Sequence, residues 1–223
     1  MNMRISELFA LEGKVACVTG ASTGLGKQVA SILLKNGVKV VGVSRNKSLL
    51  ELWSDEAGQD AAFVPFDLTE RYKIKAIADN INNQFGPPDI LINAAGINTR
   101  EHADDVTHDN WDKTIELNLA APFFMAQALV PNMIKNRWGR IVNFASLQSR
   151  RAFPSGLSYG ASKGGVEQMT RAMAEAWSAE GITVNALAPG FFPTKLTKTV
   201  FNNAILSKKN ADQTCIGRNG ILD

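Results

Sequence analysis

The sequence predicts an α/β fold, with one parallel β-sheet covered by helices on both faces. Short apolar runs, typical of buried strands, alternate from end to end with segments of helical periodicity. The chain has 223 residues, 45% of them hydrophobic and 20% charged, which suits a globular protein with a sizeable core. No repeat, low-complexity segment or linker divides it, so we expect a single domain over residues 1–223.

Six strand-like runs carry this prediction, and helical segments separate them. The expected strands are Val15–Thr19, Val38–Val43, Ala62–Phe66, Ile90–Ile92, Arg140–Ala145 and Ile182–Ala188. The expected helices are Lys27–Lys35, a segment ending near Ala57, Thr69–Phe85, Trp111–Asn136 and Ser158–Ala179. The tail after Phe191 is only weakly periodic, so no element is assigned to it.

The composition argues against several classes of protein. A net charge of +3 is too small to indicate nucleic acid or membrane binding. The two cysteines and two histidines have neither disulfide nor metal-site spacing, so we expect no metal. No uninterrupted apolar run approaches the roughly 20 residues of a membrane helix. Residues 1–14 lack the apolar segment of a signal peptide, and we expect a cytoplasmic protein.

A glycine-rich segment, Gly20-Ala-Ser-Thr-Gly-Leu-Gly26, follows the first strand and precedes the first helix. Glycines let the backbone approach a pyrophosphate, and a helix N-terminus supplies N–H donors and a positive dipole end. The spacing differs from Gly-x-Gly-x-x-Gly, and a simple tight turn is the alternative. We expect a dinucleotide site here, formed by Gly20, Ser22, Thr23, Gly24, Leu25 and Gly26.

The end of the second strand indicates which dinucleotide binds. NAD sites place an acidic residue about 20 residues after the glycines, but no acid occurs between Glu12 and Glu51. Ser44 and Arg45 stand there instead, and a hydroxyl with a guanidinium suits the 2′-phosphate of NADP. The alternative is a solvated basic turn. Asp67, after the third strand, would accept from an adenine amino group or cap the next turn.

Polar or small residues also follow the later strands. These are Asn93-Ala94-Ala95-Gly96, Ser146 and Pro189-Gly190. In open α/β sheets, ligands bind at the carboxyl ends of the strands, so we expect these residues to line one crevice. Asn118 lies inside a helical segment, where asparagine is mildly unfavourable, and it is therefore either exposed or functional.

Tyr159 and Lys163 lie four residues apart, near the start of a helical segment. Positions i and i+4 share one helical face, so the ammonium would stand beside the phenol. A fixed cation favours the phenolate, and we expect it to lower the pKa of Tyr159 enough for acid–base chemistry. The pair alone is weak evidence, because this spacing also arises by chance.

Together these residues resemble the short-chain dehydrogenase/reductase family. The matching motifs run in the family's order over nearly the whole chain: Thr19-Gly-Ala-Ser-Thr-Gly-Leu-Gly26, Asn93-Ala-Ala-Gly96, Asn118, Ser146, Tyr159-x-x-x-Lys163, and Pro189-Gly190 with Thr194. Asn93-Ala94 departs slightly, since the family usually has two asparagines there. The resemblance implies a Rossmann fold and reversible hydride transfer between NADP(H) and a small carbonyl or alcohol substrate.

The resemblance also implies the roles of single residues. Tyr159 would be the acid and base, with Ser146 hydrogen-bonded to the substrate oxygen. Lys163 would lower the pKa of Tyr159 and hold the nicotinamide ribose, while Asn118 would position a relay water. The implied cofactor contacts include those already named and add Leu68, Asn93, Ala94, Gly96, Tyr159, Lys163, Pro189, Gly190 and Thr194.

The substrate is less well determined by the sequence. Expected contacts are Ser146, Arg100, Gln148, Arg150 and Phe191, with the arginines either binding an anion or standing solvated at the cleft rim. The segment Asn98-Thr99-Arg100 is similar to sugar-acid dehydrogenases such as gluconate 5-dehydrogenase, with 3-oxoacyl carrier-protein reductases as the competing interpretation. A third interpretation is a catalytically silent protein that binds NADP or acts as a scaffold.

The family usually continues with another helix and a seventh strand after the point where this chain stops. We therefore expect a six-stranded sheet with Ile182–Ala188 as its edge. The resemblance implies a homodimer through the helices Trp111–Asn136 and Ser158–Ala179, with the family's tetramer weakened.

Overall fold

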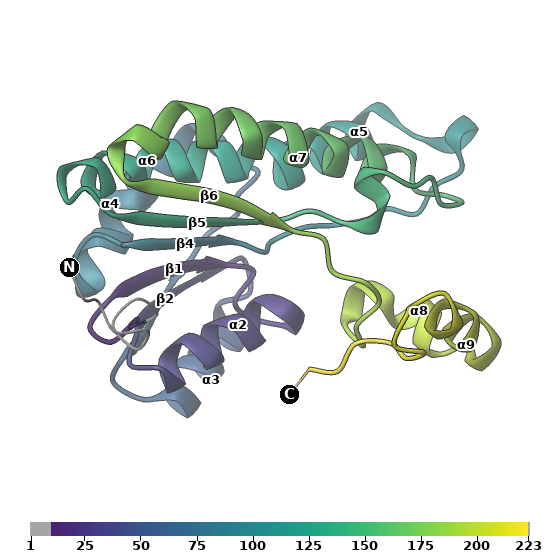
Figure 1. Ribbon diagram of the computed structural model, residues 1–223, viewed down its shortest axis with the longest axis horizontal. Helices are drawn as coiled ribbons and strands as arrows, with labels where there is room; N and C mark the ends of the chain where they lie inside the picture. The colour runs from purple at the N-terminus through teal and green to yellow at the C-terminus, as the bar shows by residue number, and fades with distance from the viewer. Residues whose placement is uncertain (1–9, 223) are drawn as a thin grey trace.

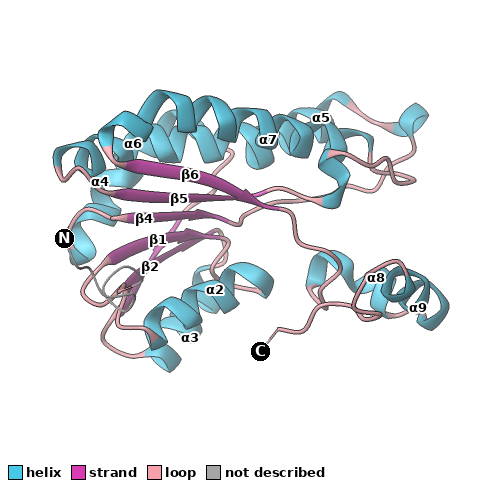
Figure 2. Cartoon of the chain, in the orientation of Figure 1, coloured by secondary structure: helices cyan, strands magenta, loops and turns pink. Residues whose placement is uncertain are grey.

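A computed structural model describes residues 10–222 and contains a six-stranded, wholly parallel sheet in the order β3-β2-β1-β4-β5-β6 (Figures 1 and 2). The strands are β1 (Val15–Thr19), β2 (Lys39–Ser44), β3 (Ala61–Pro65), β4 (Ile90–Asn93), β5 (Gly139–Phe144) and β6 (Ile182–Leu187). Between β1 and β4 the connections change direction, and in open α/β sheets ligands bind at the carboxyl ends of the strands at such a point. The predicted fold class is confirmed.

Helices cover both faces of this sheet. They are α2 (Gly24–Lys35), α3 (Lys47–Ala57), α4 (Ile74–Phe85), α5 (His108–Ile115), α6 (Ala121–Lys135), α7 (Leu157–Trp177), α8 (Lys198–Phe201) and α9 (Ala204–Asp212). In Figure 1, α2 and α3 lie below the sheet, while α4, α6 and α7 lie above it. The connections therefore pack as a doubly wound fold.

Successive residues of the central strands serve two separate cores. On the face under α2 and α3, Ala16, Val18 and Val40 pack around Trp53. On the opposite face, Cys17, Val41 and other strand residues pack against α4, α6 and α7. Because neighbouring side chains of a strand point to opposite faces, strands covered on both sides must be apolar throughout. β1 is accordingly buried at all five positions.

The helix predicted over Trp111–Asn136 is not a single α-helix. A π-helical turn, Glu116–Ala120, separates α5 from α6. The continuous helical run His108–Lys135 is long and apolar enough to cross a membrane by length and composition alone, although polar residues such as Asn118 and Gln127 interrupt it. Half of its apolar window is buried inside the protein, where Met125 and Leu129 are fully enclosed. Packing in the core accounts for its apolar character.

Other helix boundaries differ from the prediction by a few residues. α2 begins at Gly24, three residues earlier than predicted, so the glycine segment forms its first turn. A 3₁₀ turn, Arg71–Lys73, precedes α4, which starts at Ile74 rather than Thr69. The tail forms α8 and α9, which project to one side of the sheet in Figure 1. Their weak periodicity hid them, because most of their side chains are exposed and only Val200 and Asn210 are buried.

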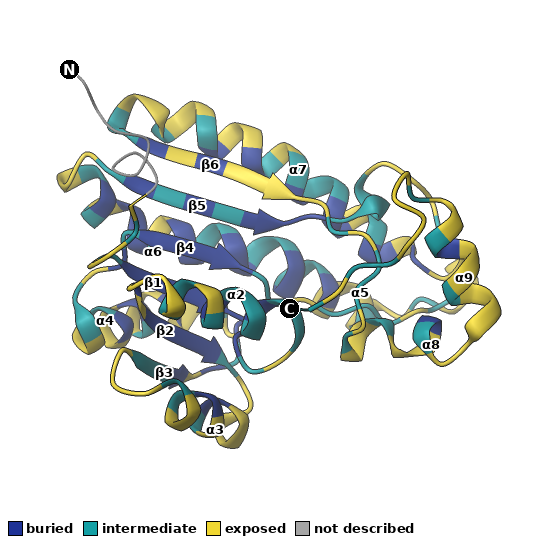
Figure 3. Ribbon diagram, turned by 60° about the horizontal axis from the view of Figure 1, so that its bottom comes forward, coloured by how far each residue is buried: buried dark blue, intermediate teal, exposed yellow. Residues whose placement is uncertain are grey.

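β6 forms one edge of the sheet in the described part of the chain, as predicted. Only Ile182 and Val184 are buried in it, and Leu187 is 52% exposed (Figure 3). After β6 the chain turns away toward α8 and returns near Gly220, whose N–H donates to the Phe191 carbonyl. The expectation that residues 1–14 lack the apolar segment of a signal peptide falls largely on residues 1–9, which lie outside the described residues.

Candidate active site and cofactor crevice

The glycine segment forms a tight bend at the end of β1. Gly20 has a φ of 74°, and a Cβ there would lie 2.9 Å from the Ala95 nitrogen. At Gly26 a Cβ would lie 2.3 Å from the Gly20 carbonyl oxygen, so no side chain fits. The extended Thr23 precedes α2, but its side chain makes no capping hydrogen bond. The first N–H groups of α2 therefore remain available to an anion, as a bound pyrophosphate requires.

Thr19 is a structural component of this crevice that sequence reasoning did not assign to the site. Its hydroxyl accepts hydrogen bonds from Ala94 N (3.1 Å) and Ala95 N (3.2 Å), which joins the end of β1 to the turn after β4. Thr19 is 2% exposed. A threonine closing an otherwise apolar strand, just before the glycines, was the signal that could have revealed it.

The ends of β2 and β3 meet beside this bend, where Arg45 Nη1 lies 3.5 Å from Asp67 Oδ2. The Asp67 carboxylate also accepts from the Thr69 N–H (3.0 Å) and hydroxyl (2.8 Å), so it caps the following turn, one of its two predicted roles. Partial burial raises the pKa of Asp67, but the Thr69 hydrogen bonds and the Arg45 charge outweigh it, leaving the pKa below its ordinary value. The Arg45 side chain is 54% exposed and accessible to a phosphate. Ser44 accepts from the Asn46 N–H.

Other predicted cofactor residues fall into two groups. The Asn93 side chain points into the core, donating to Asn143 Oδ1 (2.9 Å) and the Pro122 carbonyl (3.3 Å), and Leu68 is also buried there. These two can therefore offer only backbone groups to a ligand. Thr194, by contrast, comes over the glycine bend, where its Cγ2 lies 3.3 Å from the Cβ position of Gly24. The segment after β6, which begins with Pro189-Gly190, thus reaches the crevice from the far side.

Tyr159 and Lys163 lie in the first two turns of α7, as predicted, and are 8% and 4% exposed. Lys163 Nζ donates to the Phe144 carbonyl at 2.5 Å and lies 5.7 Å from the centroid of the Tyr159 ring. Burial lowers the pKa of Lys163 from 10.5 to about 8, because the charged ammonium loses its hydration.

The expected lowering of the Tyr159 pKa was wrong for the free protein. Burial raises this pKa above 10, although hydrogen bonding with Ser146 and the Arg100 charge act in the opposite direction. The Lys163 charge does not compensate, since its ammonium is itself desolvated and is held by the Phe144 carbonyl. The phenol is therefore protonated at neutral pH, which suits a proton donor.

Asn118 lies in the π-helical turn and is completely buried. Its amide donates to the Ile97 carbonyl (2.9 Å) and to Ser162 Oγ (3.1 Å), and its oxygen accepts from the Ile97 N–H (2.9 Å). A Cβ on Gly96 would lie 3.2 Å from Asn118 Oδ1 and 3.8 Å from Lys163 Nζ. The π-turn therefore brings this side chain beside the lysine, as π-turns often do at functional sites.

Ser146 caps the short 3₁₀ turn Leu147–Ser149 after β5, and its oxygen accepts from the Gln148 N–H at 3.1 Å. The hydroxyl proton is not used in that bond, so it can be donated to the Tyr159 oxygen in the free protein or to a substrate oxygen that takes its place. Ser146, Tyr159, Lys163 and Asn118 are thus gathered at the carboxyl ends of β4 and β5, with Arg100 close enough to act on Tyr159.

The predicted substrate residues surround this cluster unevenly. Arg100, with a left-handed φ of 57°, donates from Nη2 to the Leu196 carbonyl at 2.8 Å. The ring of Phe191 packs edge-to-face with that of Phe153, at 6.2 Å between centroids. The amide oxygen of Gln148 is buried without a hydrogen-bond partner among the described residues. Arg150 instead points along α7, where Nε donates to Glu167 at 2.9 Å.

Comparisons with known proteins agree with this arrangement. A sequence model described as short chain dehydrogenase matches residues 14–204. Gluconate 5-dehydrogenase from Gluconobacter oxydans is 36% identical over 220 residues, covering 97% of this chain and 86% of the relative. The 3-oxoacyl-[acyl-carrier-protein] reductase from Vibrio cholerae is 37% identical over 190 residues, covering 85% of this chain and 78% of the relative.

Among solved structures, the chain resembles a gluconate 5-dehydrogenase from Burkholderia cenocepacia J2315 in complex with NADP and tartrate. The TM-score is 0.89 with 35% sequence identity, and the match covers 96% of this chain and 86% of that one.

Proposed function

The chain belongs to the family of short-chain dehydrogenases, oxidoreductases that act on CH–OH groups, and we propose that it interconverts a secondary alcohol and a ketone with NADP(H), using Tyr159 as the acid and base. The observation that carries the proposal is the cluster of the buried Tyr159, Lys163 and Asn118 with the half-buried Ser146. The turn after β4 joins this cluster to the glycine bend, because Gly20 packs on Ala95 and Gly96 packs on Asn118.

The crevice residues support NADP(H) as the cofactor, and NADPH supplies the hydride when it is bound. The uncapped N-terminus of α2 faces the position of a pyrophosphate, and the side-chain-free backbone at Gly20 and Gly26 allows it to approach. Arg45 provides an exposed guanidinium at the end of β2, where a 2′-phosphate would need it.

In the reduction direction, protonated Tyr159 gives its proton to the carbonyl oxygen of the substrate. Ser146 donates a second hydrogen bond to that oxygen and stabilises the negative charge that develops on it. Lys163 stands behind the phenol, and its pKa of about 8 lets it exchange protons near neutrality. Asn118 then connects this lysine toward the turn at Gly96–Ile97, where it orients a relay water.

We propose a sugar acid as the substrate. The relatives support this choice, because the Gluconobacter oxydans protein is a gluconate 5-dehydrogenase and the Burkholderia cenocepacia structure contains the dicarboxylate tartrate. Arg100 is the charged side chain that acts on Tyr159, so a cation stands where the substrate's carboxylate would lie. Arg150 is occupied by Glu167 and is left out of the substrate site.

A 3-oxoacyl carrier-protein substrate is the second candidate, favoured by the 37% identity to the Vibrio cholerae reductase. A panel containing 5-keto-D-gluconate, an acetoacetyl thioester and neutral ketones, followed through NADPH absorbance, distinguishes the two. Highest kcat/KM on the sugar acid supports our choice, and highest kcat/KM on the thioester contradicts it.

The test of the mechanism is Tyr159→Phe, which removes only the hydroxyl. We expect turnover to fall by roughly 1,000-fold or more, since a positioned acid contributes 10²–10⁴-fold, while NADPH binds with nearly unchanged affinity. The chain offers a matched control in its only other tyrosine, Tyr72, which is 88% exposed, and Tyr72→Phe should leave turnover unchanged. Substantial turnover by Tyr159→Phe would place the acid elsewhere.

A further inference from the structure

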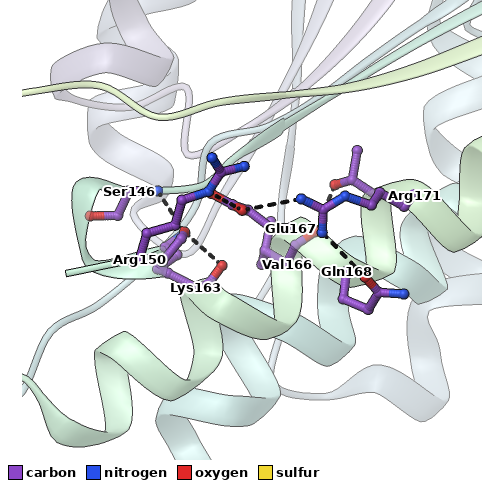
Figure 4. A network of polar contacts seen from close by, with 9 residues as sticks. Ser146, Arg150, Lys163, Val166, Glu167, Gln168 and Arg171 are labelled. Atoms are coloured by element: carbon purple, nitrogen blue, oxygen red, sulfur yellow. Dashed lines mark hydrogen bonds and ion pairs between the residues drawn. The ribbon is translucent and has the colours of Figure 1, made fainter. Parts of the chain in front are cut away.

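The short turn that carries Ser146 is fastened to α7 by the side chain of Ser149. Ser149 Oγ donates to the main-chain carbonyl of Lys163 at 2.8 Å, and it accepts from the Ser146 N–H at 3.3 Å (Figure 4). One hydroxyl therefore connects the backbone of the serine that contacts the substrate to the backbone of the lysine beside the phenol.

A second fastening lies one helical turn further along α7. Arg150 Nε donates to Glu167 Oε2 at 2.9 Å, and Arg171 lies 3.5 Å from the same oxygen (Figure 4). The Glu167 side chain is 16% exposed, while that of Arg150 is 72% exposed. Because the Arg150 end is exposed to solvent, we assign the main constraint to the half-buried Ser149.

The surface of α7 under the turn has no side chains that would hold the turn away. Gly160 and Gly164 stand there, one helical turn apart. A Cβ on Gly160 would lie 3.5 Å from the Gln148 carbonyl oxygen, and one on Gly164 would lie 3.6 Å from the Ser149 carbonyl oxygen. A methyl group would already fill the contact, so the turn rests directly on the helix. At these distances a Cβ would be in ordinary van der Waals contact with the turn, so alanine would also fit at either position.

We propose that Ser149 is a positioning residue for the reaction, one that sets the distance between the Ser146 hydroxyl and the Tyr159 hydroxyl. Tyr159 and Lys163 are rigidly related by four residues of helix, so a bond to the Lys163 carbonyl fixes the Ser146 turn relative to the phenol. Ser149 itself does not contact the reacting oxygen. The inference rests on the proposed function, in which both hydroxyls bind the same substrate oxygen.

The test combines Ser149→Ala with Ser146→Ala in a double-mutant cycle, with 5-keto-D-gluconate and NADPH as substrates. Ser149→Ala should lower kcat roughly 10- to 100-fold, because small misplacements of reacting groups cost that much. The KM and the affinity for NADPH should stay within about threefold of the wild-type values. In the Ser146→Ala background the same change should alter kcat less than about twofold, since the group it positions is gone. Ser149→Thr, which keeps the hydroxyl, should recover most of the activity.

Two controls separate this role from a purely structural one. Ser178 makes a comparable bond from its hydroxyl to a helical carbonyl, that of Ala174 at 2.6 Å, far along α7 from the site. Ser178→Ala should reduce stability without changing kcat. Full kcat in Ser149→Ala, or an equal loss with and without Ser146, would overturn the proposal. Full activity in Tyr159→Phe would instead overturn the proposed function, and the Ser149–Ser146 cycle would remain interpretable.

Discussion

Replacing Lys163 with methionine should remove a pH dependence of stability that the buried ammonium imposes on the free protein. Lys163 is 4% exposed, and its pKa is about 8 in the fold against 10.5 when solvated. Each pKa unit corresponds to about 1.4 kcal/mol, so holding the charged lysine inside costs roughly 3 kcal/mol at neutral pH. Methionine has a similar length and carries no charge.

The direction of the effect follows from proton binding. Below pH 8 both the folded and the unfolded chain hold the Lys163 proton, and the full cost is present. As the pH rises from 8 toward 10.5, the folded chain loses the proton first, so the unfolded chain binds more protons and the native protein gains stability. Between pH 7 and pH 9.5 we expect the wild type to gain about 2 kcal/mol relative to Lys163→Met.

Urea unfolding followed by tryptophan fluorescence measures this difference at the two pH values. The lost bond to the Phe144 carbonyl lowers the stability of the variant at both pH values and cancels in the comparison. Ionisation of Cys17 in the unfolded chain affects both proteins alike and also cancels. Lys35→Met, at an exposed position on α2, is the matched control, and its free energy of unfolding should differ from that of the wild type by the same amount at both pH values. If the free energies of unfolding of the wild type and Lys163→Met differ by the same amount at pH 7 and pH 9.5, the reasoning is refuted.

Other predictions concern the cofactor, the substrate, the glycine bend and assembly. NADPH should bind more tightly than NADH, and Arg45→Ala should erase most of the difference in a fluorescence titration; equal affinities in the wild type would contradict this. Arg100→Gln should raise KM for 5-keto-D-gluconate at least tenfold more than for a neutral ketone, whereas Arg150→Gln should change the two KM values alike. If Arg100→Gln also changes the two KM values alike, Arg100 is a solvated residue at the cleft rim and does not bind the carboxylate. Gly26→Ala should abolish NADPH binding, since its Cβ would overlap the Gly20 carbonyl; retained binding in calorimetry would exclude the bend as the pyrophosphate site. Light scattering should give the mass of a dimer formed through α6 and α7, and a monomer mass would contradict that contact.

Much of the fold could be predicted because its signals are local. The apolar strands must be buried on both faces, so their composition alone identifies them, as at β1 and β2. The order of the motifs along the chain then placed the glycine bend, Ser146 and the Tyr159–Lys163 pair at one edge of the sheet. The π-helical turn could not be read in this way, because Asn118 occupies it through bonds to Ile97 and Ser162, which are distant in sequence.

Charged and polar side chains were harder to assign, since their partners come from other elements. Arg150 and Arg100 looked equivalent as candidate anion ligands, but Glu167 holds the first while the second lies near Tyr159. Asn93 followed a strand like the other crevice residues, yet its side chain bonds to Asn143 in the core.

The sequence by itself determined which residues are available for chemistry, their order and the sheet on which they stand, because strand burial and helix periodicity depend on near neighbours in the chain. Only the tertiary structure decided how those residues ionise and how they are held. Tyr159 keeps its proton because neighbouring elements exclude water from it, which no local spacing reveals. Ser149 connects Ser146 to Lys163 because the fold lays the turn after β5 on the glycine face of α7, fourteen residues further along the chain.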